Sequence, residues 1–116
     1  YFECLGYSTA IDSLSAVRKL VFDDKKLTMQ ELLDALECNF EGKEDIQALL
    51  QGAPSFGNGD LEVDTLGRML EKSALDFTAR YAGKNGVQPL EIRTTSVTAN
   101  VPHGKFVGAT PNGRKA

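Results

Sequence analysis

Apolar residues recur at helical spacing through the first two thirds of the chain. An i, i+3, i+7 series that begins at Leu14 predicts an amphipathic helix over residues 12–23. Asp12 or Ser13 could accept the hydrogen bonds of its first backbone amides. The pattern therefore predicts a helix near the start of the sequence.

The next helix has the clearest start signal in the sequence. Thr28 is followed three residues later by Glu31, which is the spacing of a capping box. Leu27 and Leu32 stand where a hydrophobic staple would place them. We expect this helix to end near Gly42 and to bury four side chains: Leu32, Leu33, Leu36 and Phe40.

Two more helices are predicted further along the chain. A short helix over residues 43–50 has Glu44 and Asp45 in its first turn, where carboxylates interact favourably with the helix dipole. A loop rich in Gly, Pro, Ser and Asn separates it from a long helix over residues 61–82. The expected apolar face of the long helix consists of Val63, Leu66, Leu70, Phe77 and Tyr81, with Met69 and Ala74 beside it.

The period of the pattern then changes to two. Apolar and polar residues alternate over residues 90–93 and 96–101, which predicts one long strand, or two strands joined by a bend near residues 93–95. Residues 110–113 fit a β-turn with Pro111 at its second position. The predicted fold class is α+β and mostly helical, with about four helices over residues 8–83 and one long strand with a turn over residues 88–116.

A single strand leaves its backbone donors and acceptors unpaired, and even an isolated two-stranded hairpin is only marginally stable. The rest of the sheet must come from sequence outside this chain or from another copy of it. We therefore interpret residues 1–116 as an internal fragment of a larger domain.

Composition narrows the classes of partner. A net charge of -3 and a pI of about 5.1 argue against a nucleic-acid-binding surface. No apolar run approaches the roughly 20 residues that a membrane span requires. Two cysteines are too few for a secreted disulfide scaffold, so we expect a cytoplasmic protein with two buried, reduced thiols.

Two candidate sites do not meet their chemical requirements. The alternating polar residues from Asn58 to Asp64 resemble the start of a calcium loop, but Val63 and Met69 occupy the positions that need Gly and Glu. We interpret these carboxylates as groups at a helix N-terminus. His103 is the only histidine, which excludes a multi-histidine metal site.

The basic residues near the end of the chain have two interpretations. Lys105, Arg114 and Lys115 lie among glycines and could hold an anion, but no phosphate-binding motif is present, which favours ordinary turn chemistry. Arg93 lies in a stretch rich in threonine, where it could bind a carboxylate or phosphate or form a structural ion pair.

Several segments together resemble the glycyl radical enzymes, the pyruvate formate-lyase-like superfamily. They are residues 8–22, residues 27–36 with the following NFEG, the stretch APSFGN at 53–58 followed by Val63 and Asp64, and residues 96–116. The last segment is similar to the family pattern TxNVPxGxxxGATPDGRKA, with Asn112 where the family usually has Asp. The helical segments resemble the diol dehydratase and decarboxylase branch more than pyruvate formate-lyase itself.

The resemblance implies a much longer parent protein of anaerobic metabolism. That parent would fold as a ten-stranded α/β barrel and form a homodimer. An activase that uses S-adenosylmethionine and an iron–sulfur cluster would install a glycyl radical, and a cysteine thiyl would then abstract hydrogen from a small-molecule substrate. Neither Cys4 nor Cys38 is followed by the family's catalytic pattern. We therefore assign no catalytic residue and no metal or directly bound cofactor to this chain.

In the family, the strand that enters NVPxG runs near the active site. The resemblance therefore makes Arg93, Thr95, Val97 and Thr98 candidates for lining the substrate pocket. The predicted function is that of a fragment, inert alone, of a glycyl radical lyase or dehydratase that cleaves C–O, C–N or C–C bonds. The alternative is a non-enzymatic helical module whose exposed strand recruits a partner.

Overall fold

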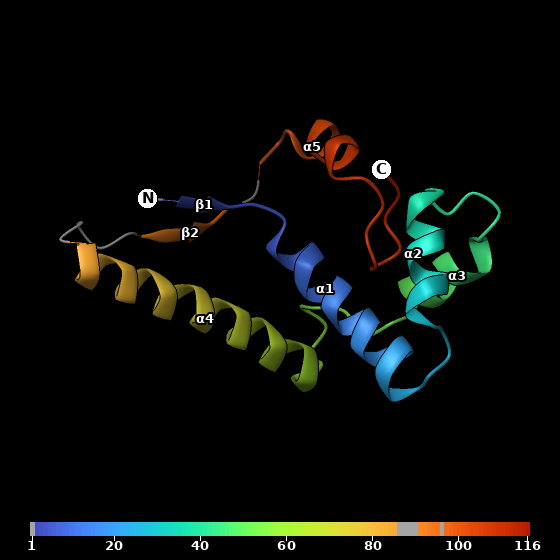
Figure 1. Ribbon diagram of the computed structural model, residues 1–116, viewed down its shortest axis with the longest axis horizontal. Helices are drawn as coiled ribbons and strands as arrows, with labels where there is room; N and C mark the ends of the chain where they lie inside the picture. Colours follow the sequence, from blue (N-terminus) through green and yellow to red (C-terminus); the bar gives the residue numbers. More distant parts are fainter. Residues whose placement is uncertain (1, 86–90, 96) are drawn as a thin grey trace.

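The computed structural model describes residues 2–85, 91–95 and 97–116, and these residues form an elongated, mostly helical structure (Figure 1). The order of elements is β1 (Phe2–Cys4), α1 (Tyr7–Val17), the π-helical segment η1 (Arg18–Asp23), α2 (Met29–Glu37), α3 (Glu44–Gln51), α4 (Leu61–Asn85), β2 (Ile92–Thr94) and α5 (Asn100–Val107). The radius of gyration is 16.2 Å, whereas a compact domain of about this size has a value of about 13 Å.

One cluster of buried side chains joins the end of α1, η1, α2 and α3. This core cluster consists of Ala16, Leu20, Leu27, Leu32, Ala35, Phe40, Ile46 and Leu50. Its most buried large side chains include Phe40, which has no exposed surface. The members come from a stretch of fewer than forty residues, so this part of the chain provides its own apolar interior.

The predicted capping box is confirmed at the start of α2. The Glu31 backbone N–H donates to Thr28 Oγ1 over 3.2 Å, and the Thr28 backbone N–H donates to Glu31 Oε2 over 2.8 Å. The Thr28 backbone N–H and, to a smaller extent, the Thr28 hydroxyl donate to the Glu31 carboxylate and thereby lower its pKa. Leu27 and Leu32 are both buried, as the predicted staple requires.

The helix α2 ends at Glu37, before the predicted boundary near Gly42. Asn39 and Phe40 both adopt positive φ values, 53° and 62°, a conformation that is uncommon outside glycine. The Phe40 N–H donates to the Ala35 carbonyl over 2.8 Å. This turn places the Phe40 side chain in the core cluster, whereas Leu33, which was expected to be buried, is exposed.

The first helix begins earlier than predicted, at Tyr7, after Gly6 in a left-handed conformation. Asp12 therefore lies inside α1 and does not cap it. Its carboxylate accepts the Phe56 N–H over 2.7 Å, while Ser15 Oγ donates to the Pro54 carbonyl over 2.7 Å. These two bonds hold the loop that precedes α4 against α1.

The long helix α4 packs against α1 only near its beginning. Gly67 is buried, and a Cβ atom there would lie 3.1 Å from Ile11 and 3.2 Å from Phe56. Further along, Met69 is 62% and Phe77 64% exposed, and the Tyr81 side chain is also exposed. The predicted apolar face is therefore buried at Val63 and uncovered at Phe77 and Tyr81.

The prediction that strand structure continues beyond Thr94 is wrong. Within the described residues, β2 covers only Ile92–Thr94, and it pairs in parallel with β1 in the register Phe2 with Ile92. Residues 97–99 form a link that leads into the helix α5. The predicted positions 88–90 and 96 lie outside the described residues.

This difference follows from the hydrogen-bond partners that the backbone of residues 97–101 can reach. A strand over residues 97–101 would need a neighbouring strand for its backbone groups, whereas a helix satisfies them locally. Pro102 lies in the first turn of α5, where a missing N–H costs nothing. The helix buries none of its residues, and Phe106 is 91% exposed.

Candidate functional site

The four predicted pocket residues lie along the segment that joins β2 to α5. Arg93 is in β2 opposite Glu3 of β1, and the Thr95 N–H donates to the Cys4 carbonyl just beyond the paired residues. Val97 and Thr98 lie in the link before α5. The structure thus places Arg93 in β2, Thr95 just after it, and Val97 and Thr98 before α5, with Thr98 at a turn.

Arg93 and Thr95 differ in their environments. The guanidinium of Arg93 is exposed and directs two N–H groups to one oxygen of Glu91, at 2.7 and 3.1 Å. Thr95 is half-buried, and its hydroxyl oxygen is buried with no hydrogen-bond partner among the described residues. A buried hydroxyl without a partner costs free energy, so Thr95 is the member of the set whose surroundings are least complete.

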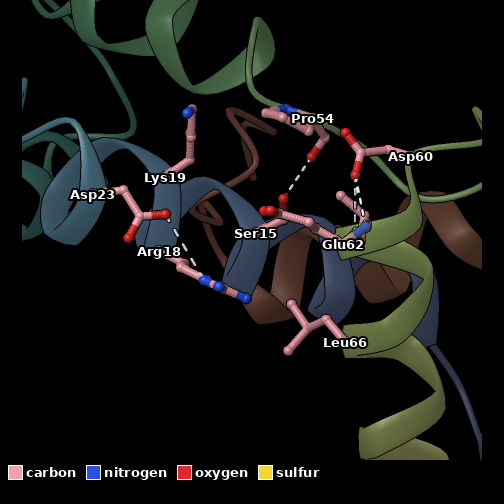
Figure 2. Close-up of a pocket in the computed structure, with 9 residues that line it drawn as sticks. Ser15, Arg18, Lys19, Asp23, Pro54, Asp60, Glu62 and Leu66 are labelled. Atoms are coloured by element: carbon pink, nitrogen blue, oxygen red, sulfur yellow. Dashed lines mark hydrogen bonds and ion pairs between the residues drawn. The ribbon is translucent and has the colours of Figure 1, made fainter.

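A small hollow lies between α1, η1 and the start of α4 (Figure 2). Its volume is about 30 Å³, which is room for about one water molecule. Its charged groups already interact locally: the Asp60 carboxylate accepts the N–H groups of Glu62 and Val63 at the beginning of α4, and Arg18 pairs with Asp23. The hollow is too small for an organic substrate.

The sequence interpretation of Asp60 as a helix-terminal carboxylate is thereby confirmed. Among the residues that the structure describes, no group of three or more His, Cys, Asp or Glu side chains is arranged to hold a metal ion.

A larger, open groove of about 540 Å³ runs between η1 and α3. Its lysines, Lys19 and Lys26, both pair with Asp24, at 3.2 and 3.8 Å. The hydrogen bond to Asp24 raises the pKa of Lys19. Both lysines of the groove are therefore already paired with a carboxylate.

Among the described residues, neither the thiols nor the single histidine belongs to a group of side chains that could hold a metal ion. Cys4 and Cys38 are half-buried, not buried as expected, and Cys38 donates weakly to the carbonyls of Ala35 and Glu41 at 3.5 Å. His103 is exposed on α5. Among the described helices, none combines the length and apolarity needed to cross a membrane.

The basic segment at the end of the chain forms a structured turn, as its simpler interpretation predicts. Arg114 donates from Nη2 to the Gly108 carbonyl at 2.8 Å, and from Nη1 to the carbonyls of Lys115 at 3.0 Å and Gly104 at 3.3 Å. Its guanidinium is therefore committed to backbone oxygens.

Sequence reasoning missed where this turn docks. Gln47 and Gln51 of α3 both donate to the Gly113 carbonyl, at 2.9 and 3.2 Å, and the Ala116 N–H donates to Asn39 Oδ1 at 2.8 Å. The i, i+4 spacing of the two glutamines put them on one helix face. Nothing in the pattern identified a partner more than sixty residues away.

Comparison with known proteins identifies a set of related enzymes. Residues 1–104 match the protein family described as "Pyruvate formate lyase-like". Isethionate sulfite-lyase from Bilophila wadsworthia is 54% identical, and that from Nitratidesulfovibrio vulgaris 52% identical, over 116 residues that make up all of this chain and 14% of each relative.

A solved structure matches at the level of the backbone. Hydroxyproline dehydratase from Clostridioides difficile, with trans-4-hydroxy-L-proline bound, gives a TM-score of 0.80 at 33% identity, over 100% of this chain and 15% of that one. The chain thus spans about one seventh of the proteins that it matches. The resemblance to glycyl radical enzymes drawn from the sequence is confirmed, and so is the expectation that the chain is a fragment.

Proposed function

This chain belongs to the pyruvate formate lyase-like family, and we propose that it is a scaffold segment of a glycyl radical lyase, inert by itself, whose parent protein carries the radical chemistry elsewhere. The observation that carries the proposal is the match of nearly the whole chain to a short portion of enzymes several times longer. Neither cysteine has the sequence pattern of the catalytic thiol, so the chemistry requires residues that this chain does not supply.

The surfaces of the chain support a role as one part of a larger domain. The helix α4 exposes Met69 and, in its distal half, Phe77 and Tyr81, and a parallel sheet of two strands leaves edges unpaired. Parallel sheets occur almost entirely with both faces covered. We infer that residues 1–116 belong to a ten-stranded α/β barrel, with the helices up to about residue 83 outside and β2 among the barrel strands.

The substrate class that we propose is a small sulfonate. Two relatives above 50% identity are named isethionate sulfite-lyases, and that name denotes release of sulfite. The proposed bond is then carbon–sulfur, which the sequence-based expectation of C–O, C–N or C–C cleavage did not include.

Within this proposal, Arg93, Thr95, Val97 and Thr98 line the substrate pocket, and Arg93 binds the sulfonate. A guanidinium can donate several N–H groups to an anion, and Arg93 already directs two of its N–H groups to one carboxylate oxygen of Glu91. Thr95 would gain a partner for its buried hydroxyl from the substrate or from the rest of the barrel. Val97 would contribute an apolar wall.

The remaining parts of the proposal follow from the family. A radical-activating enzyme that uses S-adenosylmethionine and an iron–sulfur cluster would install the glycyl radical, and the parent would act as a cytoplasmic homodimer in anaerobic metabolism. The matched relatives named above are all enzymes, so the alternative of a non-enzymatic interaction module gains no support from them.

The test uses the parent protein, activated anaerobically, with sulfite release measured from isethionate and dehydration measured with glycerol and trans-4-hydroxy-L-proline. We expect sulfite release alone; dehydration without sulfite release would refute the sulfonate assignment, and no turnover of any substrate at full radical content would refute the lyase assignment. Arg93→Gln should raise KM for isethionate about tenfold or more, because charge-assisted hydrogen bonds contribute about 1.5–3 kcal/mol. Arg18→Gln is the matched control, because Arg18 is an exposed arginine that pairs with a carboxylate away from β2.

Inertness of the chain is tested separately by electron paramagnetic resonance. After treatment with the activase, the 116-residue chain should show no glycyl doublet, and a doublet would contradict the scaffold role. Light scattering separates scaffold from module, because a strictly monomeric chain would favour the module and association through uncovered surfaces would favour the scaffold.

A further inference from the structure

The helix α5 has little packing of its own to fix its position. None of its residues is buried, and Val101, Phe106 and Val107 are all exposed. Its glycine and two valines also give it low intrinsic helix propensity. Contacts from outside the helix must therefore determine where it lies.

The Arg114 side chain supplies such contacts. Its Nη1 donates to the Gly104 carbonyl inside α5 and its Nη2 to the Gly108 carbonyl just after α5. The Gly104 carbonyl also accepts the Gly108 N–H over 3.2 Å, and a cation at a helix C-terminus interacts favourably with the helix dipole. A planar guanidinium can bridge two carbonyls at once, which a lysine ammonium on its flexible stem cannot reproduce.

The turn that carries Arg114 is closed by hydrogen bonds of its own. The Thr110 N–H donates to the Arg114 carbonyl, and Asn112 Oδ1 accepts from the Thr110 hydroxyl at 2.7 Å. Gly113 has a φ of 84°, and a Cβ there would lie 2.6 Å from Gln51 Cγ. The backbone of this turn is thus seated directly on α3.

A continuous series of contacts therefore joins the core cluster to α5. It runs from Gln47 and Gln51 of α3 through Gly113 to Arg114, and from Arg114 to both ends of the last turn of α5. Figure 1 shows the last segment of the chain lying between α5 and the α2–α3 pair. The link that contains Val97 and Thr98 enters α5 directly.

We propose that Arg114 is a positioning residue for the substrate pocket: it fixes α5, and thereby Val97 and Thr98, relative to the core cluster. This rests on the proposed function, in which Val97 and Thr98 line the pocket. It also assigns a role to Arg114, one of the basic residues for which the sequence left anion binding and turn chemistry as alternatives. Arg114 acts through backbone carbonyls and does not touch the substrate.

The first experiment measures hydrogen exchange in the 116-residue chain and does not depend on the proposed function. Arg114→Lys should accelerate exchange of the His103 and Gly108 amides about tenfold or more, while the Leu32 amide of α2 keeps its wild-type rate. Lys115→Gln, which removes a charge from the exposed neighbouring side chain, should change neither. Unchanged exchange in Arg114→Lys would overturn the proposal.

The second experiment measures kinetics in the activated parent protein, normalised to radical content and run well below the melting temperature of each variant. Arg114→Lys should raise KM for isethionate about tenfold and lower kcat less, whereas a purely structural role would reduce the amount of active enzyme and leave KM unchanged. Gln47→Ala with Gln51→Ala should shift KM in the same direction. Unchanged KM in both variants would overturn the proposal even if exchange had accelerated. Inactivity of the wild-type parent would instead refute the proposed function. The exchange result alone would then decide whether Arg114 holds α5 in place.

Discussion

The core cluster and the distal half of α4 contain similar side chains in opposite environments. Phe40 is completely buried between α2 and α3, while Phe77 is 64% exposed on a helix that extends away from α1. Both α2 and α4 have an apolar face. That of α2 is covered by elements of this chain, whereas that of the distal half of α4 is not. The comparison teaches that an amphipathic pattern identifies which face will be covered, and says nothing about whether the covering element belongs to the same segment.

The largest difference in stability should come from replacing each of these two phenylalanines by alanine. Phe40→Ala should lower the free energy of unfolding by about 3–5 kcal/mol, because it removes a fully buried ring and leaves a cavity. Phe77→Ala should change it by less than about 0.5 kcal/mol. Urea denaturation followed by circular dichroism measures both; equal losses would show that the distal half of α4 is packed as tightly as the core cluster.

The next effect concerns the turn that docks on α3. Gly113→Ala should cost about 2–4 kcal/mol, since it combines an unfavourable positive φ with a steric overlap at α3. Gly59→Ala, at the entrance to α4, also has a positive φ but faces open space, and should cost about 1–2 kcal/mol. Equal losses of stability in thermal unfolding would mean that the contact between Gly113 and α3 contributes nothing.

A smaller difference is expected between two threonines. Thr28→Ala removes the N-cap of α2 and should cost about 1 kcal/mol. Thr65→Ala in α4 removes only a hydroxyl that donates to the Leu61 carbonyl of the preceding turn, and alanine is the better helix former, so stability should hold or rise by a few tenths of a kcal/mol. A loss at Thr65 as large as that at Thr28 would contradict this ranking.

The smallest effects are pH-dependent. The folded-state pKa is lowered for Glu31 by the Thr28 N–H and for Asp76 by the Lys72 ammonium. Both therefore contribute stability above their unfolded-state pKa values and lose it as the pH falls through the folded ones. In melting curves between pH 6 and 3, Glu31→Gln and Asp76→Asn should each flatten the dependence slightly, because both groups are exposed to solvent; a steeper dependence in either variant would reverse the assigned sign.

The parts of the fold that the sequence predicted correctly depend on interactions between near neighbours. The capping box of Thr28 and Glu31, the helix after Lys43 and the turn at Pro111 are all closed within a few residues. The missed features involve distant partners: α1 begins at Tyr7, whose hydroxyl donates to the Gly67 carbonyl, and Asp12 accepts the Phe56 amide and does not cap a helix terminus.

The candidate site shows the same division. The motif resemblance placed the chain in its family, but alternation over residues 96–101 predicted a strand where the described residues form a link and α5. A period of two reports which side chains share a face, and it cannot supply the neighbouring strand that would satisfy the backbone. Whether Arg93, Thr95, Val97 and Thr98 face a substrate therefore depends on sequence beyond their own segment.

The parallel pairing of β1 with β2 has a consequence for the order of folding. The core cluster joins residues that are close in sequence, so it can form early, whereas pairing Phe2 with Ile92 must close a loop of about 90 residues. During synthesis at about 5–20 residues per second, β1 would wait for roughly 5–20 s before its partner strand emerges. For that interval the backbone edge of β1 is open to other chains, so β1 is more exposed to mispairing than β2.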